Sequence, residues 1–225
     1  GVLPESVAAS IASRLERLEP HAQRVLTVAS VLGSVFEPQV GAAILPYGSG
    51  IDDVEDSVDI AAGARLVERD PDGTVRFSHA IIAEVAGSRL PVPEQRQLHT
   101  AAAMVLSARG AEPALIAHHL VGGGKPLDAL DPLEAAGRQA LAAGAYADAG
   151  EELDMAIELG ADAVADDRLA EWHRLLAAAA RLQGDVARAR AEAELASELL
   201  GMSVPSSRAG KTIGLLGQAL IQTGH

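Results

Sequence analysis

The chain has 225 residues, of which 48% are hydrophobic but only 2% aromatic, and it carries a formal net charge of −13 and no cysteine. This length suits one large domain or two small ones, with cores of Ala, Leu, Val and Ile, and abundant Ala favours α-helices. The acidic charge argues against direct binding to nucleic acid, the lack of cysteine excludes disulfides and thiolate metal sites, and no apolar run is long enough to span a membrane.

The sequence predicts a mainly α protein with two domains, over residues 1–110 and 111–225. It begins at Gly1 rather than Met and has no charged-then-apolar leader. We therefore expect a segment of a longer protein, with a cytoplasmic location.

Short helices are expected first. Apolar residues at three- and four-residue spacing from Val7 to Leu18 predict an amphipathic helix, with Arg14 on its solvated face. Pro20 and Pro38 are each expected to begin a further helix, since proline suits the first helical turn.

A fourth helix is predicted over 52–64, with Asp52 as N-cap and Glu55 as its capping-box partner. Segments 66–69 and 74–77 then flank Asp70-Pro71-Asp72-Gly73, which indicates a β-hairpin. Helices followed by a two-stranded hairpin are the order of a winged helix.

The predicted helix over 52–64 is the one that would enter the DNA major groove in such a domain. It contains no basic residue and five acidic ones: Asp52, Asp53, Glu55, Asp56 and Asp59. A helix that approaches phosphates requires the opposite charge. We therefore predict a protein–protein or intramolecular module. After the hairpin, Ser78 is expected to cap a helix over 79–88, and another follows over 94–109.

The second half of the chain contains an internal repeat. Gly144, Gly184 and Gly224 are forty residues apart, and the same register relates Ala149 to Ala189 and Ala156 to Ala196. Each repeat is predicted to be a helix, a glycine turn and a second helix packed through small residues, as in a helical solenoid.

The turn with Gly144, Tyr146 and Ala149 resembles that of a tetratricopeptide repeat, Gly-x-Tyr-x-x-Ala. In the second repeat Val186 replaces the tyrosine, and the third stops at Gly224-His225, so we expect an array truncated at its C-terminal end. A half-repeat over 112–121 is expected to join the array to the first domain.

Three stretches together resemble the region that follows the ATPase core in STAND-type regulators, which include large LuxR-type transcription activators and some class III adenylyl cyclases. The resemblance rests on Pro4-Glu5-Ser6-Val7 with Ile11 and Arg14-Leu15, on Ala29-Ser30-Val31-Leu32-Gly33 with Phe36, and on Arg76-Phe77-Ser78-His79-Ala80-Ile81 with Leu98-His99 and Ala117-His118-His119-Leu120.

The resemblance implies a winged helix that docks on an upstream nucleotide-binding domain, followed by a tetratricopeptide-like sensor. It also implies that His79 contacts the ADP of the parent protein, because a histidine opens the matching helix in related receptors and apoptotic ATPases. Ala80 replaces the aspartate that usually follows this histidine. No cofactor is expected in the segment itself, while the parent protein is expected to bind ATP and ADP.

Other candidate sites are weaker. Ala209-Gly210-Lys211-Thr212 resembles the end of a P-loop, but Pro205 stands where a glycine is required. His118 and His119 are adjacent and point about 100° apart on a helix, so they do not form a metal site together. His99 and His173 have no acidic or histidine partner at ligand spacing, and capping or core roles are favoured for all four.

The leading hypothesis is a non-catalytic regulatory segment of an ATP-dependent signalling protein, in which the winged helix relays nucleotide state and the repeats bind an effector protein, peptide or small molecule. The alternative is a free-standing adaptor whose repeats bind peptides of partner proteins. A third possibility, a hydrolase, has no recognisable nucleophile motif to support it.

Overall fold

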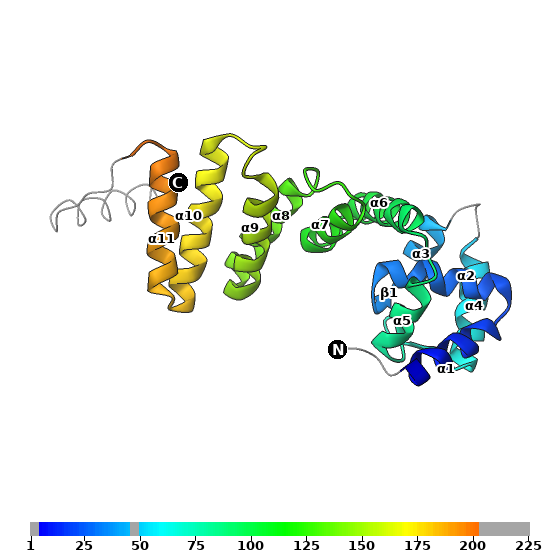
Figure 1. Ribbon diagram of the computed structural model, residues 1–225. Helices are drawn as coiled ribbons and strands as arrows, with labels where there is room; N and C mark the ends of the chain where they lie inside the picture. The colour runs from blue at the N-terminus through cyan, green and yellow to red at the C-terminus, as the bar shows by residue number, and fades with distance from the viewer. Residues whose placement is uncertain (1–4, 46–49, 203–225) are drawn as a thin grey trace. The chain divides into compact units, whose positions relative to one another are not determined.

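The computed structural model describes residues 5–45 and 50–202, which form eleven α-helices and three short strands (Figure 1). The chain divides into two compact units, Gly1–Ala129 (unit 1) and Leu130–His225 (unit 2). This division lies after α7 (Pro113–Gly122) rather than at the predicted position 110/111, because α7 packs against α6 (Val92–Ala108). Gly224 and the Gly210-Lys211 stretch lie outside the described residues.

Unit 1 contains a continuous hydrophobic core, to which Leu26, Val54, Leu66 and Ile82 contribute fully buried side chains. The predicted starts at Pro20 and Pro38 are confirmed, because both prolines occupy the first turn of a helix. The helices that precede α6 are α1 (Glu5–Glu16), α2 (Pro20–Ala29), the 3₁₀ turn η1 (Ser30–Leu32), α3 (Pro38–Ile44), α4 (Ile51–Gly63) and α5 (Ala80–Gly87).

A three-stranded antiparallel sheet completes unit 1. The predicted hairpin is present as β2 (Val67–Arg69) and β3 (Val75–Phe77), in the register Val67 to Phe77. The sequence did not reveal β1 (Val35–Phe36), which pairs with the other edge of β3, so the order is β1–β3–β2. A strand of two residues is too short to show an alternating pattern.

Two predicted helix caps are wrong. The N-cap of α4 is Gly50, whose N–H donates to the Asp53 carboxylate over 3.0 Å, so the chain enters this helix two residues before the predicted Asp52 cap. At α5 the N-cap is His79, and the Ser78 hydroxyl does not bond to the helix because Ser78 still belongs to the extended exit from β3.

The described part of unit 2 consists of two helical hairpins. They are α8 (Leu130–Ala143) with α9 (Tyr146–Gly160), and α10 (Asp166–Gln183) with α11 (Val186–Leu199), and each helix packs against the next. Gly144 and Gly184 make the two turns with φ of 80° and 87°, a left-handed conformation that favours glycine.

Small residues allow these helices to approach closely. Ala149 and Ala156 are fully buried. A Cβ atom added at Gly137 would lie 2.7 Å from the Leu153 side chain, and one at Gly160 would lie 2.8 Å from the Trp172 ring. Neither position has room for a side chain.

A polar contact joins α8 to α10. The indole N–H of the buried Trp172 donates to Glu134 Oε2 over 2.8 Å, and Arg168 lies over the same indole, 4.9 Å from the ring centroid. Although burial acts to raise the pKa of Glu134, hydrogen bonds from Trp172 and Arg138 lower this pKa below its ordinary value. The carboxylate therefore stays charged between the two helices.

Within residues 5–45 and 50–202, none of the helices has the length and apolar character needed to cross a membrane.

Replacing Gly160 by Ala should destabilise the protein by about 1–3 kcal/mol, because the new methyl group overlaps Trp172. Gly150→Ala, in the same helix, is the matched control: its Cβ would lie 3.8 Å from the nearest atom, and alanine favours helix by up to about 1 kcal/mol. Urea unfolding followed by the fluorescence of Trp172, the sole tryptophan, measures both. Equal effects of the two substitutions would contradict close packing at Gly160.

Candidate functional site

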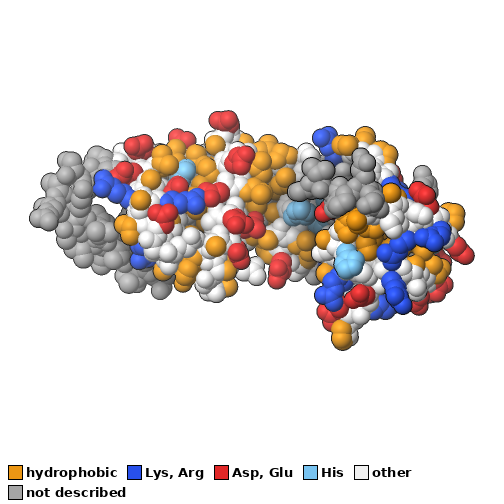
Figure 2. Space-filling view, turned by 60° about the horizontal axis from the view of Figure 1, so that its bottom comes forward, with side chains coloured by type: hydrophobic (Ala, Val, Ile, Leu, Met, Phe, Trp, Pro, Cys, Tyr) orange, Lys and Arg blue, Asp and Glu red, His pale blue; other side chains and the backbone are white. Residues whose placement is uncertain are grey.

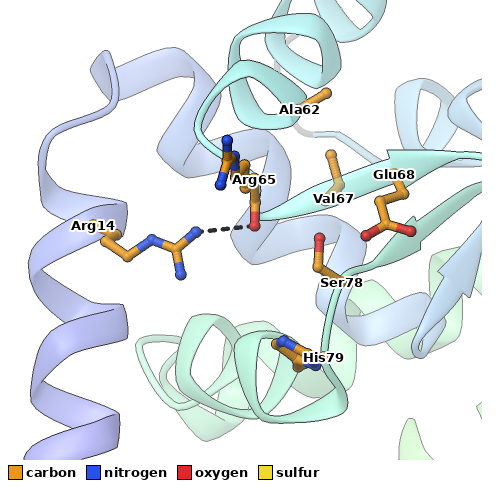
Figure 3. A pocket seen from close by; sticks show the side chains of 7 residues that line it. All are labelled: Arg14, Ala62, Arg65, Val67, Glu68, Ser78 and His79. Carbon is orange, nitrogen blue, oxygen red and sulfur yellow. Dashed lines mark hydrogen bonds between the residues drawn. The ribbon is translucent and has the colours of Figure 1, made fainter.

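The candidate site is an open cavity of about 350 Å³ in unit 1 (Figure 3). It lies where four elements end or begin: the C-terminus of α4, the start of β2, the end of β3 and the N-terminus of α5, with Arg14 of α1 at its edge. Its lining residues are Arg14, Ala62, Arg65, Val67, Glu68, Ser78 and His79.

Arg65 lies in the turn that ends α4 and has φ of 55°, the one non-glycine residue with positive φ among those described. The Arg65 N–H donates to the Ala62 carbonyl, and the Leu66 N–H reaches back to the Ala61 carbonyl. This is a Schellman motif, in which the left-handed position is usually glycine. An arginine in this conformation costs about 1–2 kcal/mol. Strained backbone conformations of this kind are found more often at functional sites.

Arg14 contacts the same turn from α1. One of its guanidinium nitrogens donates to the Ala64 carbonyl over 2.8 Å. The same nitrogen donates to the Arg65 carbonyl over 2.9 Å (Figure 3). Arg14, predicted on the solvated face of the first helix, is half-buried, and two carbonyls at the end of α4 accept from it. It brings a positive charge to the edge of the cavity.

Ser78 and His79 form the step from β3 into α5. The Ser78 hydroxyl is buried and has no hydrogen-bond partner, and it points into the space among the lining side chains (Figure 3). His79 is exposed, has extended backbone angles and makes no side-chain bond to its helix. The first N–H groups of a helix lack intrahelical partners and favour anions, so both side chains lie at an electropositive helix end.

The charges of the cavity favour an anion. Two guanidinium groups and the Glu68 carboxylate give a formal charge of +1, with His79 neutral. Within the described ranges neither Arg14 nor Arg65 forms an ion pair, whereas many other arginines do. Basic side chains also gather beside a histidine on one face of unit 1 (Figure 2). A phosphate group suits the guanidinium, imidazole and free backbone N–H groups at this site, because all of them bind phosphate oxygens.

The residues predicted to pack the repeat turns lie in unit 2 and have no part in this cavity. Gly144 and Gly184 form turns, Ala149 and Ala156 are buried, and Tyr146 is half-buried, with its carbonyl accepting from Gln183. In the second hairpin Ala196 is buried and Ala189 is half-buried.

A second cluster, which the sequence did not reveal, joins α6 to α7. The Nδ1 atoms of His99 and His119 lie 3.0 Å apart, and the rings of His118 and His119 are in edge contact. His99 has no partner at metal-ligand spacing in the sequence, but the packing of α6 on α7 brings it against His119, twenty positions away. His173 likewise has a partner, since its Nδ1 lies 2.7 Å from Glu192.

His119 is the unusual member of this cluster. Its side chain is fully buried, and its Nε2 atom has no hydrogen-bond partner. Burial, with smaller contributions from His99 and His118, lowers the pKa of His119 to about 4. The imidazole is therefore neutral at physiological pH. Among the residues that the structure places, no group of three or more potential ligands is arranged to hold a metal ion.

Comparison of the chain with protein-family models, curated proteins and solved structures returned no match.

The pKa of His119 predicts a stability that falls in mild acid. Above pH 6.5 the histidine is neutral in both states, whereas between pH 6.5 and about 4 only the unfolded chain takes up the proton. The free energy of unfolding should therefore fall by roughly 1–3 kcal/mol across this window, and the lowered pKa of buried His99 acts in the same direction.

Urea unfolding followed by far-UV circular dichroism between pH 7.5 and 5.5 tests this dependence. His119→Phe should flatten the slope, and the exposed His21→Gln should leave it unchanged. Identical slopes in wild type and His119→Phe would contradict the assignment.

Proposed function

We propose that the chain is a non-catalytic regulatory segment of a STAND-type ATP-dependent signalling protein, one that regulates transcription. Unit 1 would act as a winged helix that relays nucleotide state from an upstream nucleotide-binding domain, and unit 2 as a tetratricopeptide-like array that binds an effector or partner protein. The observation that carries the proposal is the cationic cavity around His79.

The topology of unit 1 supports the winged-helix assignment. The chain passes through α2, β1, α3, α4, β2 and β3, and the sheet order β1–β3–β2 leaves the β2–β3 hairpin as the wing. The acidic α4 supports a role other than DNA binding. Its Glu55 and Asp59 pair with Arg69 on the hairpin, over 2.5 and 2.9 Å, so this arginine is already neutralised.

The cavity supports contact with a nucleotide phosphate. His79 is exposed at the start of α5, where an imidazole N–H can donate to an anion that the helix end also attracts. The Arg65 guanidinium would supply a further donor at the same cavity. A phosphate from the upstream domain would be a suitable acceptor for either group.

Unit 2 supports the effector role less specifically. Its two hairpins leave large apolar side chains exposed, among them Met155, Leu182, Val186 and Leu195. Stacked helical hairpins of this kind present extended binding surfaces. The exposed apolar side chains also fit the alternative, a free-standing adaptor that binds peptides. A Walker-type phosphate loop upstream of Gly1 in the full gene would favour the regulatory segment over the adaptor.

In the parent protein, His79→Ala should weaken ADP binding by roughly 10- to 100-fold, the value of one hydrogen bond to a charged group. Arg65→Gly should also weaken ADP binding while leaving the fold at least as stable, because glycine suits the left-handed turn. Isothermal titration with ADP measures the affinities. His21→Ala, an exposed histidine outside the cavity, is the control and should leave the affinity unchanged. An unchanged affinity in His79→Ala would make His79 an ordinary helix-start residue.

The isolated chain should bind neither ATP nor duplex DNA measurably at physiological salt, because the ATPase core is missing and α4 repels phosphates. Fluorescence anisotropy with labelled duplexes and labelled ATP tests this. Tight binding of DNA would overturn the assignment of unit 1.

A further inference from the structure

Three histidines gather where α7 packs against α6. The ring centroids of His99, on α6, and His119, on α7, are 5.1 Å apart. The ring of the exposed His118 lies 5.3 Å from that of His119 and 5.9 Å from that of His99. Among the residues of α7, Ala117 and His119 are the buried ones. The imidazole pair is therefore a large part of the contact that holds this helix.

The two helices lie very close together at this point. A Cβ atom added at Gly122 would lie 2.8 Å from Nδ1 of His99, and one added at Gly123 would lie 2.6 Å from the Thr100 hydroxyl oxygen. The end of α7 therefore packs directly on α6, with no space for a further side chain. His99 and His119 have little room to separate unless α7 moves.

The hydrogen bond between the two rings limits how many protons they can carry. Their Nδ1 atoms are 3.0 Å apart and share one hydrogen. A charged imidazole has a hydrogen on both nitrogens, so two charged rings would point two N–H groups at each other. The contact accepts at most one added proton. That proton belongs on His99, because Nε2 of His119 is buried without a partner and a charged ring there would be unpaired.

No carboxylate is placed to compensate positive charge on these rings. Within residues 5–45 and 50–202, none of the three histidines forms an ion pair. The charged groups around them are Arg96, which lies beside the end of α7, Arg109 of α6, and Glu37, which lines the same hollow as the buried histidine. Glu37 already pairs with Arg109 over 2.5 Å. A second proton would therefore be repelled.

We propose that the three histidines form an acid-sensitive switch, in which protonation of both His99 and His119 releases α7 from α6 while the core of unit 1 stays folded. The proposal is independent of the function proposed for the cavity at His79. Burial and the neighbouring imidazoles lower the pKa of both His99 and His119, that of His119 to about 4. In a released α7 both rings would instead take up protons near the ordinary histidine pKa of about 6.5.

The release is local because α7 is held less firmly than α6. Near its two ends α6 is tied to the rest of unit 1 by the pairs Arg24–Glu94 and Glu37–Arg109, each over 2.5 Å. In the part of the chain that the structure describes, no residue of α7 forms an ion pair. Elements with few such contacts open before the core does.

Hydrogen exchange of the full 225-residue chain at pH 7.5 and 5.5 tests the switch, after correction for the intrinsic pH dependence of amide exchange. Each histidine that takes up its proton only when α7 is released increases the opening constant by about tenfold over this window. The protection of α7 amides should therefore fall by about 10- to 100-fold, while that of α2 and α4 amides changes much less. Unchanged protection of α7, or an equal loss in all three helices, would overturn the proposal.

Two variants connect the effect to the imidazole pair. His99→Gln keeps a donor for Nδ1 of His119 but cannot become charged, so the loss of α7 protection between pH 7.5 and 5.5 should become about tenfold smaller than in wild type. His173→Gln is the control, because His173 is a partly buried histidine of unit 2 that pairs with Glu192. It should leave the pH dependence of α7 unchanged.

The full wild-type pH dependence in His99→Gln would overturn the role of the pair. Should α7 already be open at pH 7.5 in this variant, His119→Phe decides the question by the same criterion, because it fills the buried position with a ring that takes up no proton.

Discussion

The geometry of unit 1 depends on the end of β3, which is bonded on both sides. The Phe77 N–H donates to the Ser34 carbonyl over 2.9 Å, and the Ser78 N–H donates to the Leu66 carbonyl over 3.0 Å. The Phe36 and Phe77 rings pack with centroids 5.8 Å apart, which adds a hydrophobic contact across the same pair of strands. The step into α5 at His79 therefore cannot shift without breaking sheet pairing, and α5 in turn packs on α1 and α2.

This arrangement explains why an anion at the His79 cavity would affect the whole of unit 1. The cavity is formed by the end of α4, the start of β2, the end of β3 and the start of α5. Arg14 of α1 donates to two carbonyls at the end of α4. A ligand that bonds to Arg65 and His79 together would stabilise one relative position of these elements. A ligand shifts a conformational equilibrium only by its difference in affinity for the two states.

Local rules predicted the helices well and the sites less well. The prolines at 20 and 38 fix helix starts by their own geometry, and the hairpin follows from Asp72-Gly73 between alternating segments. Strand β1 was missed because its two residues pair only with a segment forty positions away. Its partner is not encoded locally.

The same limit applies to side chains. His79 was predicted from a resemblance, but its neighbours Arg14 and Arg65 are brought to it by tertiary packing and by a left-handed turn that sequence rules assign to glycine. The cap expected at Ser78 failed because an extended His79 takes the N-cap position and the serine hydroxyl remains unpaired. The contact between His99 and His119 depends on how α6 packs against α7. The periodicity of the sequence does not indicate how two helices pack.

His79 and His119, both in unit 1, have different chemical properties because one is exposed and the other is buried. His79 is exposed at a helix N-terminus, where its imidazole can bind a solvent-accessible anion. His119 is fully buried beside two other imidazoles, and its pKa of about 4 excludes the charged form under physiological conditions. A buried neutral imidazole with one unpaired nitrogen gains most from a neutral hydrogen-bonding partner, because a charged one would have to be desolvated. The two histidines therefore differ in access: His79 is exposed to solvent, whereas His119 is enclosed by its neighbours.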